Sequence, residues 1–255
     1  DPSQRLDAIF FSPHKFLGGP GASGVMLLSK ELYRNRVPDH PGGGTVLWTT
    51  PWGEQRYYDD IEIREDGGTP GFLQAIRAAL AIQLKDNMGV AAMLEREEKL
   101  KELLLKRLAG HPGVQVLEPG QVNRLGIVSF YSLHRHHNLI VRLLNDRFGV
   151  QTRGGCSCAG TYGHILLHVK REQSRHITER IDHGDLSEKP GWVRISLHPV
   201  LTEEEVEAIA AAVHEVLDNY ERWQEEYVFD ARTAEFHHRS WKPQLPDLAR
   251  DFRPW

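Results

Sequence analysis

A lysine with two hydrogen-bonding neighbours follows a short apolar run near the start of the sequence. The stretch reads FFSPHKFLGGPGASGVMLLSK and places Ser12, His14 and Lys15 before a glycine-rich turn. A neutral lysine amine bonds covalently to an aldehyde such as that of pyridoxal phosphate, and serine and histidine can donate hydrogen bonds to its phosphate. The glycines let the backbone pass close to a bound cofactor. A surface lysine beside a flexible loop is the alternative, and these residues alone do not decide between them.

The sequence contains two cysteines, Cys156 and Cys158, separated by one residue. This spacing suits neither a disulfide framework nor a complete zinc site. The histidine cluster at 134–137 also does not predict a metal site, because adjacent histidines cannot easily chelate one ion. We therefore expect no metal, a solvated helix start at 134–137, and a reducing, cytoplasmic location.

Composition excludes several classes of protein. The chain has 255 residues, 40% hydrophobic and 26% charged, with a formal net charge of −4. This balance carries no basic footprint for nucleic acid. No apolar run approaches the roughly 18–20 residues that span a bilayer. We expect a chain with no nucleic-acid and no membrane partner.

The elements that must position the candidate residues alternate along the chain. The patterns predict strands at 8–11, 24–29, 114–117, 126–131, 150–153 and 192–197. They predict helices at 72–87, 90–109, 137–148, 170–183 and 202–219. Thr202 and Glu205 have the spacing of a capping box at the start of the last helix. The segment 37–68 is loop-rich, and we assign no firm structure from residue 221 onward.

Five stretches in order resemble the motifs of one enzyme family. They read SPHKFLGGPGASGVML, PGGGTV, REDGGTP, TRGGCSCAG and WVRISLHPVLTEEEVEAI. Together they are similar to the class V (fold-type I) pyridoxal-phosphate-dependent aminotransferase and cysteine desulfurase family. The first resembles the family's cofactor-lysine motif, and the ordered set makes the resemblance specific although each motif alone is weak.

The resemblance implies roles for the residues around the lysine. Lys15 would form the Schiff base with pyridoxal phosphate and later move the substrate α-proton. Ser12 and His14 would hold the phosphate. Thr69 would donate to a phosphate across a dimer interface, so a homodimer is expected.

The resemblance also implies how an amino-acid substrate is handled. Arg153 and Arg194 would lie near its carboxylate, which suits a planar guanidinium, and Arg194 is favoured for the direct contact. Cys158 falls at the position of the sulfur-accepting cysteine of desulfurases, whereas Cys156 does not match. The segment 159–193 is longer than desulfurases usually show at this place.

The expected fold is α/β, comprising the end of a large pyridoxal-phosphate domain and a small C-terminal α/β domain. The corresponding ranges are 1–89, 90–220 and a tail at 221–255. Only fourteen residues precede Lys15. Members of the family carry, before the lysine, an aspartate that pairs with the pyridine nitrogen of the cofactor, and Asp7 lies too near Lys15 in the sequence to be assigned that role. We therefore expect the chain to be the C-terminal portion of a longer enzyme, with apolar faces that another segment or a second copy covers.

Three functions remain open. The first is a class V aminotransferase-like enzyme acting on an α-amino acid through a lysine Schiff base. The second is a cysteine desulfurase or selenocysteine lyase that uses Cys158. The third is a non-catalytic fragment or interaction module without a complete cofactor site.

Overall fold

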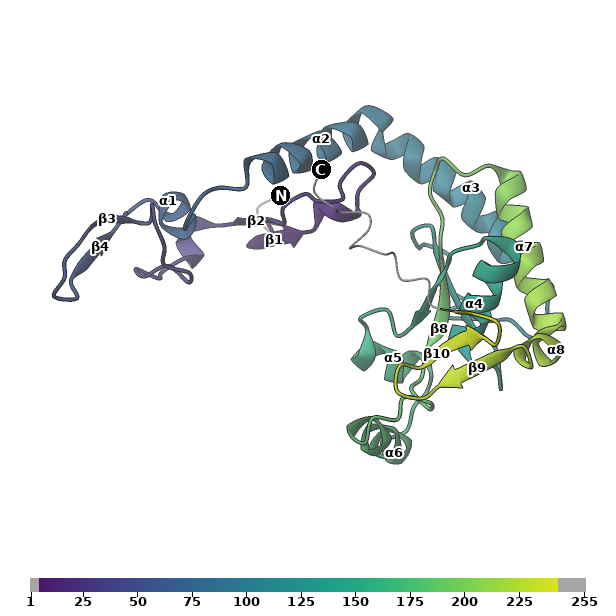
Figure 1. Ribbon diagram of the computed structural model, residues 1–255. Helices are drawn as coiled ribbons and strands as arrows, with labels where there is room; N and C mark the ends of the chain where they lie inside the picture. The colour runs from purple at the N-terminus through teal and green to yellow at the C-terminus, as the bar shows by residue number, and fades with distance from the viewer. Residues whose placement is uncertain (1–4, 243–255) are drawn as a thin grey trace, which may run out of the picture. The chain divides into compact units, whose positions relative to one another are not determined.

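A computed structural model describes residues 5–242 of the chain (Figure 1). The chain divides into two compact units, Asp1–Ala92 and Met93–Trp255. Helices and strands are mixed in both units, which confirms the expected α/β class. No helix within residues 5–242 is long and apolar enough to cross a membrane.

The first unit is built around the lysine turn. Strands β1 (Ala8–Phe11) and β2 (Val25–Leu28) pair antiparallel, and the 3-10 helix η2 (Pro13–Lys15) begins the connection between them. Helix α2 (Phe72–Met88) supports this connection. Arg77 Nη1 donates to the Pro20 carbonyl oxygen at 2.7 Å, which ties the glycine-rich loop to the helix.

The segment expected to be loop-rich contains some regular structure. After the 3-10 helix η3 (Lys30–Leu32), strands β3 (Val46–Thr49) and β4 (Gln55–Tyr57) form an antiparallel hairpin. The short helix α1 (Ile61–Glu65) follows and is capped by a carboxylate of Asp60, which accepts from the Ile63 backbone N–H at 3.0 Å. The segment 37–68 is loop-rich as expected, but its three short elements β3, β4 and α1 were not predicted.

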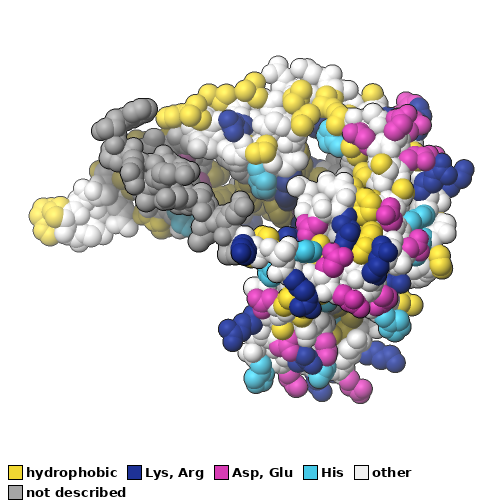
Figure 2. Space-filling view, turned by 45° about the vertical axis from the view of Figure 1, so that its right-hand side comes forward, with side chains coloured by type: hydrophobic (Ala, Val, Ile, Leu, Met, Phe, Trp, Pro, Cys, Tyr) yellow, Lys and Arg dark blue, Asp and Glu magenta, His cyan; other side chains and the backbone are white. Residues whose placement is uncertain are grey.

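The apolar stripe of α2 is not buried within its unit. Its buried residues are Ala78 and Ala81, whereas its large apolar side chains are exposed. These are Phe72, Leu73, Ile76, Leu80 and Leu84. Figure 2 shows yellow apolar side chains along the top of the view, the region where Figure 1 places α2, whereas positive and negative side chains intermix at the lower right. Such an exposed stripe marks a surface for another protein segment.

The second unit contains a four-stranded antiparallel sheet. Its strands are β5 (Gln115–Val116), β6 (Ile127–Tyr131), β7 (Arg153–Gly155) and β8 (Trp192–Ser196), in the spatial order β5-β6-β8-β7. Alternate residues of a strand point to opposite faces. Val193 and Ile195 of β8 are buried in the core, so Arg194 between them belongs to the other face.

Three helices supply the rest of that core. They are α3 (Val90–Leu108), α4 (His137–Phe148) and α7 (Glu203–Asp218). Their apolar stripes pack with β6 and β8 in one cluster of buried side chains. The Thr202 hydroxyl and Glu205 carboxylate form the reciprocal hydrogen bonds of a capping box at the start of α7, which confirms that prediction.

The remaining elements complete the second unit. Helices α5 (Gly160–Leu166) and α6 (Arg171–Asp182) occupy most of the long segment between β7 and β8. After α7 come α8 (Tyr220–Gln224) and a hairpin of β9 (Tyr227–Asp230) and β10 (Glu235–His238). These elements lie in the part of the chain to which we assigned no structure from the sequence. Residues 243–255 lie outside the described residues.

Candidate functional site

The Lys15 turn is a compact 3-10 turn with its polar side chains outward. The backbone N–H of Lys15 donates to the Ser12 carbonyl oxygen at 3.1 Å, and that of Phe16 donates to Pro13 at 2.9 Å. Pro13 is buried, Ser12 is half-buried, and Lys15 is exposed together with His14. Within residues 5–242 the side chains of Ser12, His14 and Lys15 make no hydrogen bond or ion pair, so all three are available to a ligand.

Gly19 lets the loop fold directly onto this turn. A Cβ added at Gly19 would lie 1.9 Å from the Pro13 carbonyl oxygen, so no other residue fits there without moving the backbone. The close approach leaves a hydroxyl, an imidazole and an amine on one exposed turn. This donor set fits part of a pyridoxal phosphate, with a phosphate that accepts hydrogen bonds and an aldehyde that reacts with an amine.

Thr69 lies where the two other glycine-rich segments of the first unit meet. The Gly68 backbone N–H donates to the Gly43 carbonyl oxygen at 2.8 Å. A Cβ at Gly67 would lie 2.8 Å from the His40 carbonyl oxygen. Thr69 itself is exposed, and no hydrogen bond connects it to the Lys15 turn in the described part of the chain. The structure thus places Thr69 in a separate glycine-rich cluster.

The two predicted arginines lie opposite each other in the second unit. Arg153 of β7 pairs with Arg194 of β8, and Arg194 pairs with Ser129 of β6 on its other side. Directly opposite residues of an antiparallel pair have neighbouring side chains on one face of the sheet. This face lies opposite the helix-covered core, so the sheet presents two guanidinium groups on its open side.

Arg194 has unused hydrogen-bonding capacity. Its Nε atom is buried and has no hydrogen-bond partner within residues 5–242, where neither arginine forms an ion pair. Like charges directly opposite each other on a sheet are destabilising unless an anion lies between them. A carboxylate accepts two parallel hydrogen bonds from a guanidinium and would satisfy both requirements.

Cys158 lies on a tight turn immediately after β7. The Ala159 backbone N–H donates to the Cys156 carbonyl oxygen at 2.8 Å. The two central residues, Ser157 and Cys158, have φ values of 51° and 64°. Left-handed backbone at two consecutive side-chain-bearing residues costs on the order of 1 kcal/mol each. The turn presents the exposed Cys158 thiol, and Arg153 Nη2 donates to Cys158 Sγ at 3.2 Å.

Cys156 has a different environment. It is half-buried, and its thiol donates to the Pro190 carbonyl oxygen at 2.9 Å. Burial raises the pKa of the Cys156 thiol, and the nearby charge of Lys189 only partly opposes that effect. Cys156 is therefore held as a neutral thiol, and the two cysteines are not equivalent.

A cavity of about 450 Å³ lies beside Cys158. Its lining comes from the end of β7, the start of α4, the residues before β8 and the turn between β9 and β10. Among the described residues, the charged side chains that line the cavity are Arg153 and Lys189, and no aspartate or glutamate of residues 5–242 lines it. The cavity is therefore suited to an anion.

His137 forms one wall of this cavity and was not predicted to have any such role. Burial lowers the pKa of His137 to about 3, assisted by the charges of His136 and Lys189. A Cβ at Gly191 would lie 2.6 Å from the His137 ring. The expectation of a solvated helix start was wrong at this position. The glycine at 191, just before β8, was the available sequence signal for a large side chain packed against it.

The histidine cluster does not form a metal centre in the described structure. His136 and His137 stack with ring centroids 4.6 Å apart, and burial also lowers the pKa of His136. In the part of the chain that the structure describes, no group of three or more His, Cys, Asp or Glu residues could hold a metal ion.

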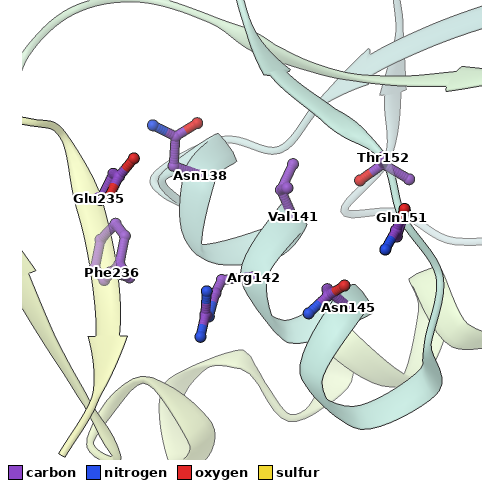
Figure 3. A pocket seen from close by; sticks show the side chains of 8 residues that line it. All are labelled: Asn138, Val141, Arg142, Asn145, Gln151, Thr152, Glu235 and Phe236. Carbon is purple, nitrogen blue, oxygen red and sulfur yellow. The ribbon is translucent and has the colours of Figure 1, made fainter. Parts of the chain in front are cut away.

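A second cavity, of about 470 Å³, lies between α4 and β10 (Figure 3). Figure 3 shows side chains of α4 facing Glu235 and Phe236 of β10, with Gln151 and Thr152 beyond them. None of the residues singled out from the sequence lines this cavity. The chemistry-bearing side chains therefore gather at the Lys15 turn in the first unit and around Cys158 in the second.

Comparison with known proteins places these features in a family. The model of the aminotransferase class-V family matches residues 3–209. A cysteine desulfurase of Shigella flexneri is 32% identical over 158 residues, which cover 61% of this chain and 38% of that protein. A probable cysteine desulfurase of Staphylococcus epidermidis is 30% identical over 158 residues, covering 61% of this chain and 37% of that protein. The chain thus matches less than half the length of these relatives.

Solved structures show the same fold. The apo structure of a cysteine desulfurase from Thermococcus onnurineus NA1 superposes with a TM-score of 0.64 at 24% identity, covering 84% of this chain and 47% of that one. A cysteine desulfurase from Escherichia coli gives a TM-score of 0.63 at 22% identity, covering 84% and 46%. The family model covers most of this sequence, and the fold agrees with it. The chain therefore belongs to the aminotransferase class-V family, a family of pyridoxal-phosphate-dependent enzymes.

Proposed function

We propose that these residues belong to a pyridoxal-phosphate-dependent cysteine desulfurase, in which Cys158 takes the sulfur of an α-amino acid substrate. The observation that carries this proposal is the Arg153 guanidinium donating to Cys158 Sγ at 3.2 Å on an exposed turn. A guanidinium N–H that donates to a sulfur atom can stabilise the negative charge that develops there when the thiol reacts as a nucleophile. The cysteine desulfurases among the relatives support the same activity.

Lys15, Ser12 and His14 would hold the cofactor. Pyridoxal phosphate, when bound, supplies an aldehyde that captures amines and a ring that withdraws electrons from the bond being broken. The Lys15 amine would hold the aldehyde carbon and then carry a proton to and from the substrate α-carbon. The Ser12 hydroxyl and His14 imidazole would donate to the phosphate. All three are exposed or half-buried on one turn and have no competing partner among residues 5–242.

The second unit would hold and desulfurate the substrate. Arg194 would bind the α-carboxylate, since its Nε is buried without a hydrogen-bond partner in the described residues. The Cys158 thiolate would attack the substrate sulfur. The bond between that sulfur and the substrate β-carbon breaks, the carbon takes a proton, and Cys158 is left as a persulfide. Arg153, which the sequence assigned to the carboxylate, would instead stabilise charge on the Cys158 sulfur.

Aminotransfer without thiol participation is the second candidate. It rests on the same Lys15 turn and on the family itself, and it needs no role for Cys158. The two activities differ in product, because aminotransfer yields an oxo acid and desulfuration yields sulfide. If the parent enzyme forms sulfide and the Cys158→Ser variant does not, the desulfurase activity is supported. Oxo acid formed equally by the parent and Cys158→Ser supports the aminotransferase.

The cofactor assignment is tested by chemical trapping in the full-length protein. Borohydride reduction of the protein loaded with pyridoxal phosphate, followed by peptide mapping, should label Lys15. A label on another lysine, with Lys15→Ala still retaining cofactor covalently, would contradict the assignment. Absence of any labelled lysine, together with no absorbance change on cofactor addition, would favour a non-catalytic interaction module.

We also propose that the enzyme is a homodimer in which Thr69 contacts cofactor across the interface. Thr69 is exposed in its glycine-rich cluster, and the neighbouring β3–β4 hairpin exposes Trp52 at 83%. Large exposed apolar side chains of this kind are typical of subunit interfaces. Thr69→Ala should weaken cofactor retention without unfolding the protein. A monomer at micromolar concentration with full cofactor occupancy would contradict the proposal.

A further inference from the structure

The cavity beside Cys158 is lined in part by the long segment between β7 and β8 and by a hairpin outside the residues that match the family model. Leu186, Lys189 and Pro190 come from the long segment between β7 and β8. Thr233 and Ala234 come from the hairpin that follows α8. The Leu186 backbone N–H donates to the Ala231 carbonyl oxygen at 2.7 Å, which joins the two segments. The two segments thus enclose space next to the reactive thiol.

The polar lining of the cavity selects an anion. Arg153 and Lys189 line it, no acidic residue does, and neither cation forms an ion pair within residues 5–242. The Ser157 Oγ atom is buried and has no hydrogen-bond partner among the described residues. Two cations without an ion-pair partner in the described residues therefore line one space. A carboxylate would accept hydrogen bonds from these groups.

The cavity is distinct from the position of the substrate carboxylate. Arg194, which we assign to that carboxylate, is not among the residues that line the cavity, whereas Cys158 is. A volume of about 450 Å³ accommodates a small molecule but not a protein domain. A persulfide on Cys158 must pass its outer sulfur to an acceptor before the thiol can react again. The acceptor must therefore approach Cys158, and the cavity provides a place for it.

We propose that this cavity binds the sulfur acceptor, a small thiol that carries a carboxylate, with Lys189 contacting the carboxylate. This inference rests on the proposed desulfurase function. The acceptor thiolate attacks the outer sulfur of the Cys158 persulfide, the sulfur–sulfur bond breaks, and Cys158 leaves as a thiolate. The acceptor departs as a persulfide. One sulfur atom moves, and no oxidant or reductant is consumed.

Thiol–disulfide exchange tests the site without cofactor or substrate. Dithiodipropionate carries a carboxylate at each end, and hydroxyethyl disulfide is its neutral counterpart. Either disulfide reacts with the Cys158 thiolate to give a mixed disulfide and a free thiol. The full chain with Cys156→Ala keeps Cys158 as its single cysteine. The rate of mixed-disulfide formation with each probe, followed by mass spectrometry, is the measurement.

Lys189→Gln should slow the reaction with dithiodipropionate about threefold, the size expected for an exposed charge pair. The reaction with hydroxyethyl disulfide should not change. Lys189→Arg should restore the rate with the anionic probe. Lys170→Gln, which removes an exposed lysine that does not line the cavity, is the control and should leave both rates unchanged.

Two results would overturn the proposal. One is an equal effect of Lys189→Gln on both probes, or no effect on either. The other is an equal decrease in the rate with dithiodipropionate in Lys170→Gln, which would show that the net charge of the protein, and not a site at Lys189, controls the rate. The exchange reaction does not require desulfuration. If the enzyme forms no persulfide but still shows the charge-selective exchange, the desulfurase function is contradicted and the anion site is supported.

Discussion

Arg153 and Arg194 are directly opposite each other on the antiparallel strands β7 and β8, on the face of the sheet away from the core. They differ in their partners. Arg153 donates to Cys158 Sγ, whereas the buried Nε of Arg194 has no partner among residues 5–242. The two arginines therefore have different environments, although the family resemblance implied that both lie near the substrate carboxylate.

Arg194→Lys tests the carboxylate role. Lysine keeps the charge but loses the planar, two-point hydrogen bonding of arginine. In the full-length enzyme we expect kcat/KM to fall on the order of a hundredfold, with folding and cofactor binding little changed. The measurement is steady-state kinetics with cysteine. A decrease of only a fewfold would mean that Arg194 does not bind the carboxylate directly, and Arg153 would become the better candidate.

Arg153→Gln tests the thiolate role. Its guanidinium donates to the Cys158 sulfur, so its loss should reduce the alkylation rate of Cys158 by iodoacetamide near neutral pH, by about threefold to tenfold. Arg153→Lys should retain part of the rate. Arg175→Gln, on the exposed α6, is the matched control. Equal alkylation rates in Arg153→Gln and the parent would show that the contact has no effect on reactivity.

Gly154→Ala tests the packing that holds β7 against α4. A Cβ at Gly154 would lie 2.3 Å from the Asn138 side-chain oxygen, so that side chain must move. Asn138 also donates to the Ala234 carbonyl oxygen at 2.6 Å, and that bond would be strained or lost. We expect urea denaturation to show a loss of about 1–3 kcal/mol. Gly120→Ala, with no atom within 4 Å of the added Cβ, should change stability far less.

His137 should make the second unit less stable in mild acid. Its pKa is lowered to about 3 by burial, below the ordinary value of 6.5. Between these values the unfolded chain binds a proton and the folded chain does not. The free energy of unfolding should therefore fall as pH drops below 6.5, by at most about 1.4 kcal/mol per pH unit from this group.

The variant His137→Asn should reduce the loss of stability between about pH 7 and about pH 5. His136, whose pKa burial lowers in the same direction, will leave a smaller dependence in that variant. His134→Asn is the control, because His134 is exposed. An unchanged pH dependence in His137→Asn, measured by urea denaturation, would show that His137 does not stay neutral in the folded protein.

The five longer helices could be predicted from the sequence because their apolar spacing and end signals agree, whereas the short helices α1, α5 and α8 were not predicted. Helix α4 has the predicted bounds, His137–Phe148, and ends where Gly149 takes a φ of 67°. The capping box at Thr202 likewise depends only on neighbouring residues. Local signals of this kind do not depend on what packs against the helix.

Features that depend on contacts between residues distant in the sequence could not be predicted. Lys101 is 1% exposed within α3, and its amine donates to Glu98 and to the carbonyl oxygens of Val122 and Arg124. Nothing in the helical pattern distinguishes it from the exposed lysines nearby. The pairing of β9 with β10, and the cavity that their turn helps to enclose, also arise only in three dimensions.

The same distinction applies to the candidate site. The candidate residues Ser12, His14 and Lys15 could be identified from the sequence because they belong to one contiguous motif. The separate environments of Cys156 and Cys158 could not be predicted from their spacing. They depend on the Pro190 carbonyl oxygen and on the Arg153 guanidinium, which reach the two sulfur atoms from different elements.

The most direct test of the central claim is the mass of the Cys158 peptide after the full-length, cofactor-loaded enzyme has turned over cysteine without an acceptor thiol. The account predicts that this peptide gains the mass of one sulfur atom, that the gain is reversed by a reducing thiol, and that it is absent in Lys15→Ala. Turnover of cysteine with an unmodified Cys158 peptide, or with the added sulfur on Cys156, would contradict it.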